Sequence, residues 1–173
     1  MTGIEARADI GAVAIVEIHQ LYGRQSHLID EGHASEWAAT FTADGEFHSP
    51  SYPAPVVGVE ALTQFADAFF TNASVAGEAH RHVLTNIAVD RVGDDELEVH
   101  AYLQIVATRI GGDSRLVRFT TVTDRVVREG GQWRIARRVV RRTIRPLSPD
   151  ISGSTDVHPE SFAEHCFWRN TRS

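Results

Sequence analysis

Residues 20–37 read QLYGRQSHLIDEGHASEW and contain the predicted end of a long amphipathic helix. Apolar residues before and within this segment recur at helical spacing, so we predict a helix from an N-cap at Asp9 to about Glu31, ended by Gly32. Asp30 falls in the last turn, where the helix dipole disfavours a carboxylate, and this position favours a functional role. His27 precedes Asp30 by three residues and therefore shares its helix face.

Two shorter helices are predicted downstream. The first covers residues 35–41, with Ser35 as N-cap, and the second runs from Val59 to about Asn72 with an apolar face rich in phenylalanine. Between them, residues 42–45 have the composition of a turn that leads into a short strand at 46–48. The PSYPAP segment at 50–55 is expected to form an irregular loop of the kind that borders a pocket.

The hydrophobic period changes to two after His80. Runs at about 81–91, 96–110, 114–128 and 132–144 are rich in Val, Ile and Thr and are separated by glycine-containing turns. This pattern predicts an antiparallel meander. Helices followed by a meander indicate an α+β fold, in which N-terminal helices pack in a strongly curved antiparallel sheet. We expect one domain over residues 1–145 and a C-terminal tail, 146–173, with a short helix near 159–170.

Composition excludes several classes of protein. The chain is 42% hydrophobic and 23% charged, which is ordinary for a globular protein. A formal net charge of −6 argues against a nucleic-acid partner. No apolar run approaches the roughly 20 residues that span a bilayer, and the N-terminus lacks a secretory pattern. The single cysteine, Cys166, excludes an intrachain disulfide. We therefore expect a cytoplasmic protein without a membrane partner.

Four segments together resemble a known family. They are LIDEGHASEWAATFTADGEF at 28–47, GVEALTQF at 58–65, HRHVLTNIAVD at 80–90 and EGGQWRIARRVVRR at 129–142. Over about residues 10–144 the chain resembles the SnoaL-like branch of the nuclear-transport-factor-two-like superfamily. The resemblance implies a cone-shaped, cystatin-like α+β barrel with a deep apolar pocket. Members include scytalone and bile acid dehydratases, ketosteroid isomerase, polyketide cyclases and dioxygenase β subunits, so the fold alone does not give the function.

The resemblance implies a catalytic pair. Asp30 matches the aspartate that ends the first helix of the dehydratases, and His82 matches their histidine on the first long strand. In those enzymes the carboxylate orients the imidazole, which moves a proton at carbon. Each residue alone also fits a structural role. The dehydratases place a tyrosine where this chain has Gln25, so Gln25, His27 or Tyr22 would have to take its part.

Further residues are candidates for contact with the substrate. Asn86 shares strand parity with His82 and is expected to reach a substrate oxygen. Arg138 or Arg142, from the arginine-rich final strand, could point inward toward an acidic group or an enolate oxygen. The other predicted lining residues are Trp37, His48, Tyr52, Phe65, Phe69 and Phe119.

The remaining polar features suggest neither metal nor cofactor. No two histidines lie at i, i+4 spacing beside a glutamate, and cysteine pairs are absent from the sequence. We expect a cofactor-free site. His100, Tyr102 and Gln104 alternate along one strand and are expected on the outer sheet face, where a homodimer or higher homo-oligomer would form.

Two functions follow. The first is a cofactor-independent dehydratase, cyclase or isomerase that acts on a hydrophobic oxygenated ring compound, polyketide- or steroid-like, through His82 and Asp30. The alternative is a non-catalytic ligand-binding or assembly subunit that resembles the β subunits of ring-hydroxylating dioxygenases. In that case Asp30 and His82 would be structural polar residues.

Overall fold

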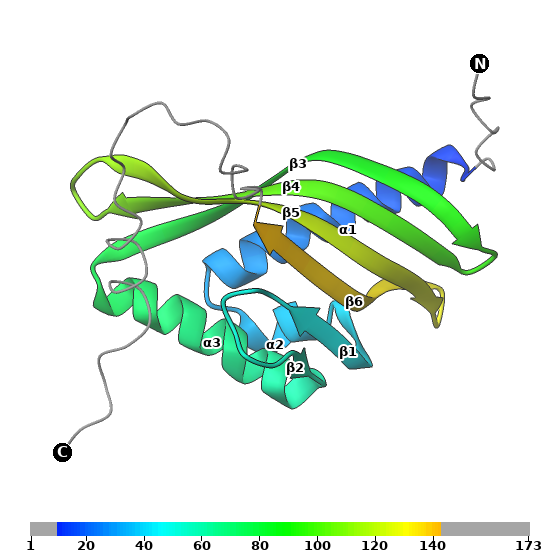
Figure 1. The fold of residues 1–173 in the computed structure, drawn as a ribbon, viewed down its shortest axis with the longest axis horizontal. Helices are drawn as coiled ribbons and strands as arrows, with labels where there is room; N and C mark the ends of the chain where they lie inside the picture. The colour runs from blue at the N-terminus through cyan, green and yellow to red at the C-terminus, as the bar shows by residue number, and fades with distance from the viewer. Residues whose placement is uncertain (1–9, 143–173) are drawn as a thin grey trace, which may run out of the picture. The chain divides into compact units, whose positions relative to one another are not determined.

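Helices line one face of a curved sheet in the computed structural model, which describes residues 10–142 (Figure 1). The helices are α1 (Ala12–Asp30), α2 (Ala34–Ala38) and α3 (Val59–Val75). The strands are β1 (Phe41–His48), β2 (Val56–Val57), β3 (Glu78–Gly93), β4 (Glu96–Arg109), β5 (Ser114–Glu129) and β6 (Gln132–Arg142). The predicted tail helix and Cys166 lie outside the described residues.

The six strands form one open sheet in the order β2-β1-β6-β5-β4-β3. Strands β3 to β6 make the predicted antiparallel meander. The predicted α+β class is confirmed, with one correction: β1 runs parallel to β6, so the sheet is mixed rather than wholly antiparallel. This pairing brings the N-terminal half of the chain against the last strand of the meander.

Helix α1 begins after Gly11 rather than at the predicted Asp9, which lies outside the described residues. Its buried positions, Ile18, Tyr22, Gln25 and Ile29, follow one another at spacings of three and four and form a single stripe. The helix ends before Gly32, which has a positive φ of 80°. A Cβ there would lie 2.9 Å from ring carbons of Phe70, so the close approach of α3 also requires glycine.

The predicted turn at residues 42–45 lies inside strand β1. Pairing with β6 passes from Phe41 opposite Ile135 to Glu46 opposite Arg137, so the strand is irregular over those residues. The Thr42 hydroxyl donates to Asp44 Oδ1 at 2.9 Å within the irregular part. The turn-forming residues therefore bulge the strand without ending it. Helix α2 likewise begins one residue earlier than predicted and ends before Phe41, which starts β1.

Four bulges interrupt the meander, one of them at Val92 near the end of β3. In β3, residues 86 and 87 lie opposite one residue of β4, and Asn86 has a positive φ of 54°. Val117 is the extra residue in β5, and Ala136 is the extra residue in β6. A bulge bends its strand and reverses the alternation of side chains beyond it. These bulges therefore curve the sheet and decide which side chains face the helices.

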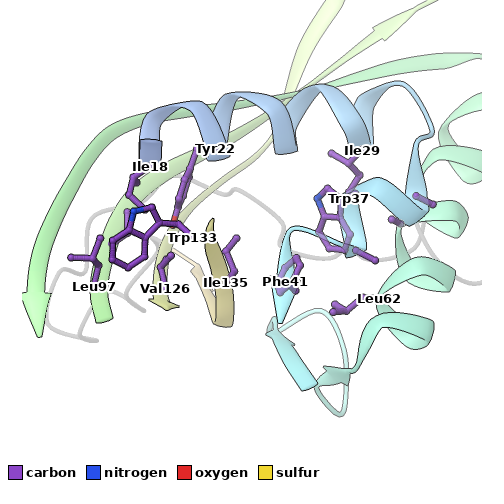
Figure 2. Close-up of a cluster of buried hydrophobic side chains, with 14 residues drawn as sticks. Ile18, Tyr22, Ile29, Trp37, Phe41, Leu62, Leu97, Val126, Trp133 and Ile135 are labelled. Carbon is purple, nitrogen blue, oxygen red and sulfur yellow. The ribbon is translucent and has the colours of Figure 1, made fainter. Parts of the chain in front are cut away.

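The core lies between the helices and the concave face of the sheet. Ile18 and Tyr22 of α1 lie over Leu97, Val126 and Trp133 (Figure 2). Toward the other end of α1, the cluster continues through Ile29, Trp37, Phe41 and Leu62 (Figure 2). Within residues 10–142, none of the helices has the length and hydropathy of a bilayer-spanning segment.

Candidate active site

Asp30 and His82 are joined by two hydrogen bonds. His82 Nδ1 lies 2.6 Å from Asp30 Oδ1, and the backbone N–H of His82 donates to Asp30 Oδ2 at 2.9 Å. The last turn of α1 supplies the carboxylate and β3 supplies the imidazole. The side chain of Asp30 is only 5% exposed and that of His82 is 10% exposed. The two contacts hold the carboxylate and the imidazole in one relative orientation.

This geometry determines the tautomer of His82. An ionised carboxylate only accepts hydrogen bonds, so the short contact requires the proton of a neutral imidazole to be on Nδ1. The lone pair is then on Nε2. The ring lies against Phe69, with centroids 5.0 Å apart, and lines an apolar pocket. The pair therefore presents a basic nitrogen to that pocket.

The pocket occupies the space between the helices and the concave face of the sheet. The space between its lining side chains, with open solvent at the mouth included, is about 600 Å³. Trp37, Phe47 and Phe65 form a cluster of ring contacts on one wall. Most of its lining is apolar, but five polar side chains interrupt it besides His82 and the hydroxyl group of Tyr52. They are Gln25, Ser26, Ser49, Arg118 and Arg138.

Arg138 belongs to a buried polar network. Its Nε donates to Asp124 Oδ1 at 3.0 Å and its Nη2 donates to Oδ2 at 2.6 Å. The Tyr22 hydroxyl donates to the same Oδ2 at 2.5 Å. Asp124 is fully buried and Arg138 is 5% exposed. Asp124 thus neutralises Arg138 and holds its guanidinium at the pocket wall.

Burial raises the pKa of Tyr22 well above its usual value, and the charge of Asp124 adds to the effect. Burial acts to lower the pKa of Arg138, but the charge and hydrogen bonds of Asp124 together with those of Tyr22 outweigh it, and that pKa is raised. Tyr22 is therefore a neutral donor, and Arg138 is a permanent cation.

Gln25 carries an unused acceptor. The Thr40 hydroxyl donates to the Trp37 carbonyl at 2.7 Å, so its oxygen accepts from Gln25 Nε2 at 2.6 Å. This arrangement places Gln25 Oε1 at the remaining position of the amide. That oxygen is buried and has no hydrogen-bond partner among residues 10–142. A buried, unpaired carbonyl in a pocket wall can accept a hydrogen bond from a ligand hydroxyl.

Arg118 lines the same pocket from β5, near Tyr52 of the 50–55 loop. Burial raises the pKa of Tyr52, and the positive charge of Arg118 acts against that increase. Arg118 pairs with Ile105 of β4, whose side chain also faces the pocket. Arg118 forms no ion pair with any carboxylate between residues 10 and 142.

The structure brings most of the predicted lining residues together. His82 lines the pocket, with Asp30 directly behind it. Tyr22 lies beneath Arg138 rather than in the wall, with the guanidinium carbon 5.5 Å from its ring centroid. The other predicted residues that line the pocket are Gln25, Trp37, Tyr52, Phe65, Phe69 and Arg138.

Two strand residues do not line the pocket. Asn86 is exposed because the bulge at residues 86–87 reverses the parity that it would share with His82. Phe119 lies on the opposite face of the sheet, where its ring meets that of Tyr102 at 5.9 Å. Arg118 occupies the inward position that we predicted for Phe119. Simple alternation without the bulge therefore gave the wrong face for Asn86. Phe119 faces outward because the regular alternation of β5 places Arg118 and Thr120 inward.

Two histidines also lie outside the pocket. The His27 side chain is 79% exposed and lies 3.8 Å from Glu31. His48 Nε2 lies 2.6 Å from Glu46 Oε2, and Arg137 Nε lies 3.3 Å from the same nitrogen. His48 lines a neighbouring surface depression together with residues of the 50–55 loop. Neither imidazole is placed to take the part of the family tyrosine.

Asp124 and Arg118 are the polar residues that sequence reasoning missed. Asp124 stands between Val122 and Val126 at the spacing of one strand face, and a carboxylate among inward valines indicates a buried partner. That signal was present in the sequence. Arg118 shares the strand parity of Thr120 and Val122, so the same spacing indicated its inward direction.

The described part of the chain holds no group of three or more His, Cys, Asp or Glu side chains arranged for a metal ion. Its polar groups are suited instead to moving a proton and to binding oxygen atoms of an organic ligand.

Comparisons with known proteins agree with this architecture. Residues 12–139 match the model of the SnoaL-like domain. Aln2 from a Streptomyces species is 28% identical, with a TM-score of 0.70 over 76% of this chain and 92% of that one. A Catenulispora acidiphila protein, solved in complex with S-DNPA, is 32% identical, with a TM-score of 0.66 over 75% and 93% of the two chains.

A nuclear-transport-factor-two-like protein with a cystatin-like fold from Novosphingobium aromaticivorans shares the fold, with 20% identity, a TM-score of 0.64 and coverage of 77% and 90%. Among curated protein sequences, no significant match was found.

Proposed function

Because the chain belongs to the SnoaL-like domain family, we propose that its pocket is the active site of a cofactor-independent enzyme that moves a proton at carbon. The substrate is a hydrophobic, oxygenated ring compound, polyketide- or steroid-like. The reaction belongs to the set of dehydration, cyclisation and isomerisation, which share a first step. The observation that carries the proposal is the Asp30–His82 pair in the wall of an apolar pocket.

In the first step, His82 Nε2 removes a proton from a carbon next to a carbonyl group. The C–H electrons move toward the carbonyl and form an enolate, while His82 becomes an imidazolium. Asp30 stabilises that cation through the Nδ1 hydrogen bond, which strengthens as the ring gains charge. The low exposure of both side chains excludes water and increases this electrostatic effect.

Arg138 is the candidate group for the enolate oxygen. It lines the pocket, remains protonated, and is held in place by Asp124. A fixed cation aimed at developing negative charge lowers the barrier without reorganisation during the reaction. Asp124 and Tyr22 do not reach the pocket lining, so they act as positioning residues through Arg138.

The second step depends on the substrate. Loss of a hydroxyl group from the carbon beyond the enolate forms a double bond, and the His82 proton leaves with it as water. Return of that proton to another carbon gives an isomer. Attack of the enolate carbon on a second carbonyl closes a ring and leaves an alkoxide, which takes the proton from His82. Each path returns His82 to its neutral form.

We also propose that the chain forms a homodimer through the outer face of the sheet. Val83, Tyr102 and Leu116 are between 39% and 56% exposed and lie on three adjacent strands. Such a patch favours association with a second copy. Light scattering would measure the mass in solution.

Deuterium exchange tests the enzymatic proposal without knowledge of the natural substrate. In D₂O, the wild-type protein is expected to accelerate exchange beside the carbonyl of a bicyclic ketone such as 2-tetralone, followed by NMR. His82→Gln should lose roughly 10²- to 10⁴-fold of the catalysed rate. His100→Gln, on the exposed outer face, is the matched control and should retain it. Exchange by His82→Gln at the wild-type rate would contradict the proposal.

A further inference from the structure

One positive charge in the pocket is not neutralised by any carboxylate of residues 10–142. Of the lining residues that carry or acquire positive charge, His82 is matched by Asp30 and Arg138 is matched by Asp124. Arg118 has no carboxylate partner among residues 10–142. The neighbouring Arg115 differs in this respect, because it pairs with Glu78 at 2.8 Å.

The fold directs Arg118 to this position. Thr120, Val122 and Asp124 alternate on the buried face of β5, and Arg118 continues that alternation. Its cross-strand partner Ile105 lines the pocket beside Leu103. The bulge at Val117 then changes the parity, and Leu116 is exposed on the outer face. Arg118 is thus the first inward residue of β5 after the bulge at Val117. Its side chain is half-buried rather than fully solvated.

An unmatched guanidinium in an apolar wall favours an anionic ligand. Arginine binds a carboxylate through two parallel N–H donors, and partial burial increases the strength of that contact. The protein as a whole carries a formal charge of −6, so a cation at this site is not part of a general positive surface. Tyr52 is close enough for its pKa to respond to Arg118, which places the cation beside the 50–55 loop.

We propose that Arg118 is a specificity-determining residue that binds a carboxylate of the substrate. The substrate class is then a ring compound with an acidic side group, held with that group at Arg118 and with its ring among Trp37, Phe65 and Phe69. This inference rests on the proposed function, because it concerns the same pocket. Arg138 does not fill the same role, since Asp124 already neutralises its charge and accepts from its Nε and Nη2.

Binding measurements test Arg118 without any catalytic step. The probes are 2-naphthylacetic acid and 2-naphthylacetamide, which have the same ring and differ in charge at neutral pH. Isothermal titration calorimetry should show that the wild-type protein binds the acid roughly 10- to 100-fold more tightly than the amide, the range for a hydrogen bond to a charged group. Arg118→Gln should remove this preference, and Arg118→Lys should retain part of it.

Two controls separate the site from general electrostatics and from catalysis. Arg137→Gln removes a charge beside Glu46, outside the pocket lining, and should leave the preference for the acid unchanged. His82→Gln should also retain that preference while it loses deuterium exchange, so failure of either proposal is distinguishable.

If the wild-type protein does not bind the acid more tightly than the amide, or if folded Arg118→Gln keeps the full preference, the inference is overturned. Both results would leave the exchange test of His82 unaffected.

Discussion

The carboxylate of Asp30 binds both the side chain and the backbone N–H of His82, through contacts of 2.6 and 2.9 Å. The second contact has a consequence for the chemistry. The backbone N–H of His82 occupies Asp30 Oδ2, so Asp30 Oδ1 is the oxygen that binds the imidazole. The side-chain hydrogen bond and the position of β3 are therefore coupled.

This coupling predicts the effect of Asp30→Asn. The asparagine oxygen must accept from the His82 backbone N–H, so its amide NH₂ turns toward Nδ1. Nδ1 then has to accept, and the imidazole proton moves to Nε2, where it removes the basic lone pair from the pocket. We expect the ¹⁵N NMR signals of His82 to report the exchanged tautomer and catalysed deuterium exchange to fall roughly 10²-fold or more. Retention of the Nδ1–H tautomer would contradict this explanation.

The buried pair of Asp124 and Arg138 predicts an asymmetric effect on stability. Asp124→Asn leaves the charge of Arg138 without its counter-ion in a buried site, which should cost about 3–5 kcal/mol in the free energy of unfolding. Replacement of both residues by Leu and Met should recover a large part of that loss, because neither variant side chain carries charge. Urea denaturation measures both effects, and a cost below about 1 kcal/mol for the single variant would refute the assigned role.

Tyr22 predicts a dependence of stability on alkaline pH. Burial and the charge of Asp124 raise its folded-state pKa, so its contribution is complete below the unfolded-state pKa of about 10 and declines as pH rises above that value. Tyr22→Phe lacks this contribution. The difference in unfolding free energy between the wild-type protein and Tyr22→Phe should therefore shrink as pH increases from about 9 to about 11. A difference that is constant or grows over this interval would argue against a buried neutral phenol.

The unpaired Gln25 Oε1 predicts a preference for a ligand hydroxyl. The wild-type protein should bind 2-naphthol more tightly than 2-methoxynaphthalene, by roughly tenfold, because only the naphthol can donate to that oxygen. Gln25→Leu should remove the difference. Gln104→Leu is a suitable control, because Gln104 pairs with Phe119 across β4 and β5 and does not line the pocket. Equal discrimination by wild-type protein and Gln25→Leu would show that the carbonyl does not contact the ligand.

The sequence was sufficient for the fold class and for the pairing of Asp30 with His82. The strand runs and glycine turns defined the meander, and the family resemblance indicated the two residues that the hydrogen bonds join. The sequence was insufficient to predict side-chain direction where a bulge shifts the alternation. Asn86 lost its inward position because a single extra residue in a strand reverses every direction beyond it. The error at Phe119 is different, since the regular alternation of β5 already places Arg118 inward with Thr120.

Long-range pairing was the second source of error. The turn-forming residues 42–45 remain within β1 because β6, about 90 residues later, provides a parallel partner on both sides of them. No local pattern in the sequence contains that information. Asp124 differs from these cases, since its place between two inward valines made its burial predictable from strand spacing alone.

The central claim is that Asp30 and His82 act as one catalytic unit, and a double-mutant cycle in the deuterium-exchange assay tests it most directly. Asp30→Asn, His82→Gln and the double variant are compared through kcat/KM for exchange, with folding of each verified by circular dichroism. Since Asp30 acts only through His82, the double variant should be no slower than His82→Gln alone, within about threefold. Losses that multiply in the double variant would show that the two residues act independently and would contradict the proposed dyad.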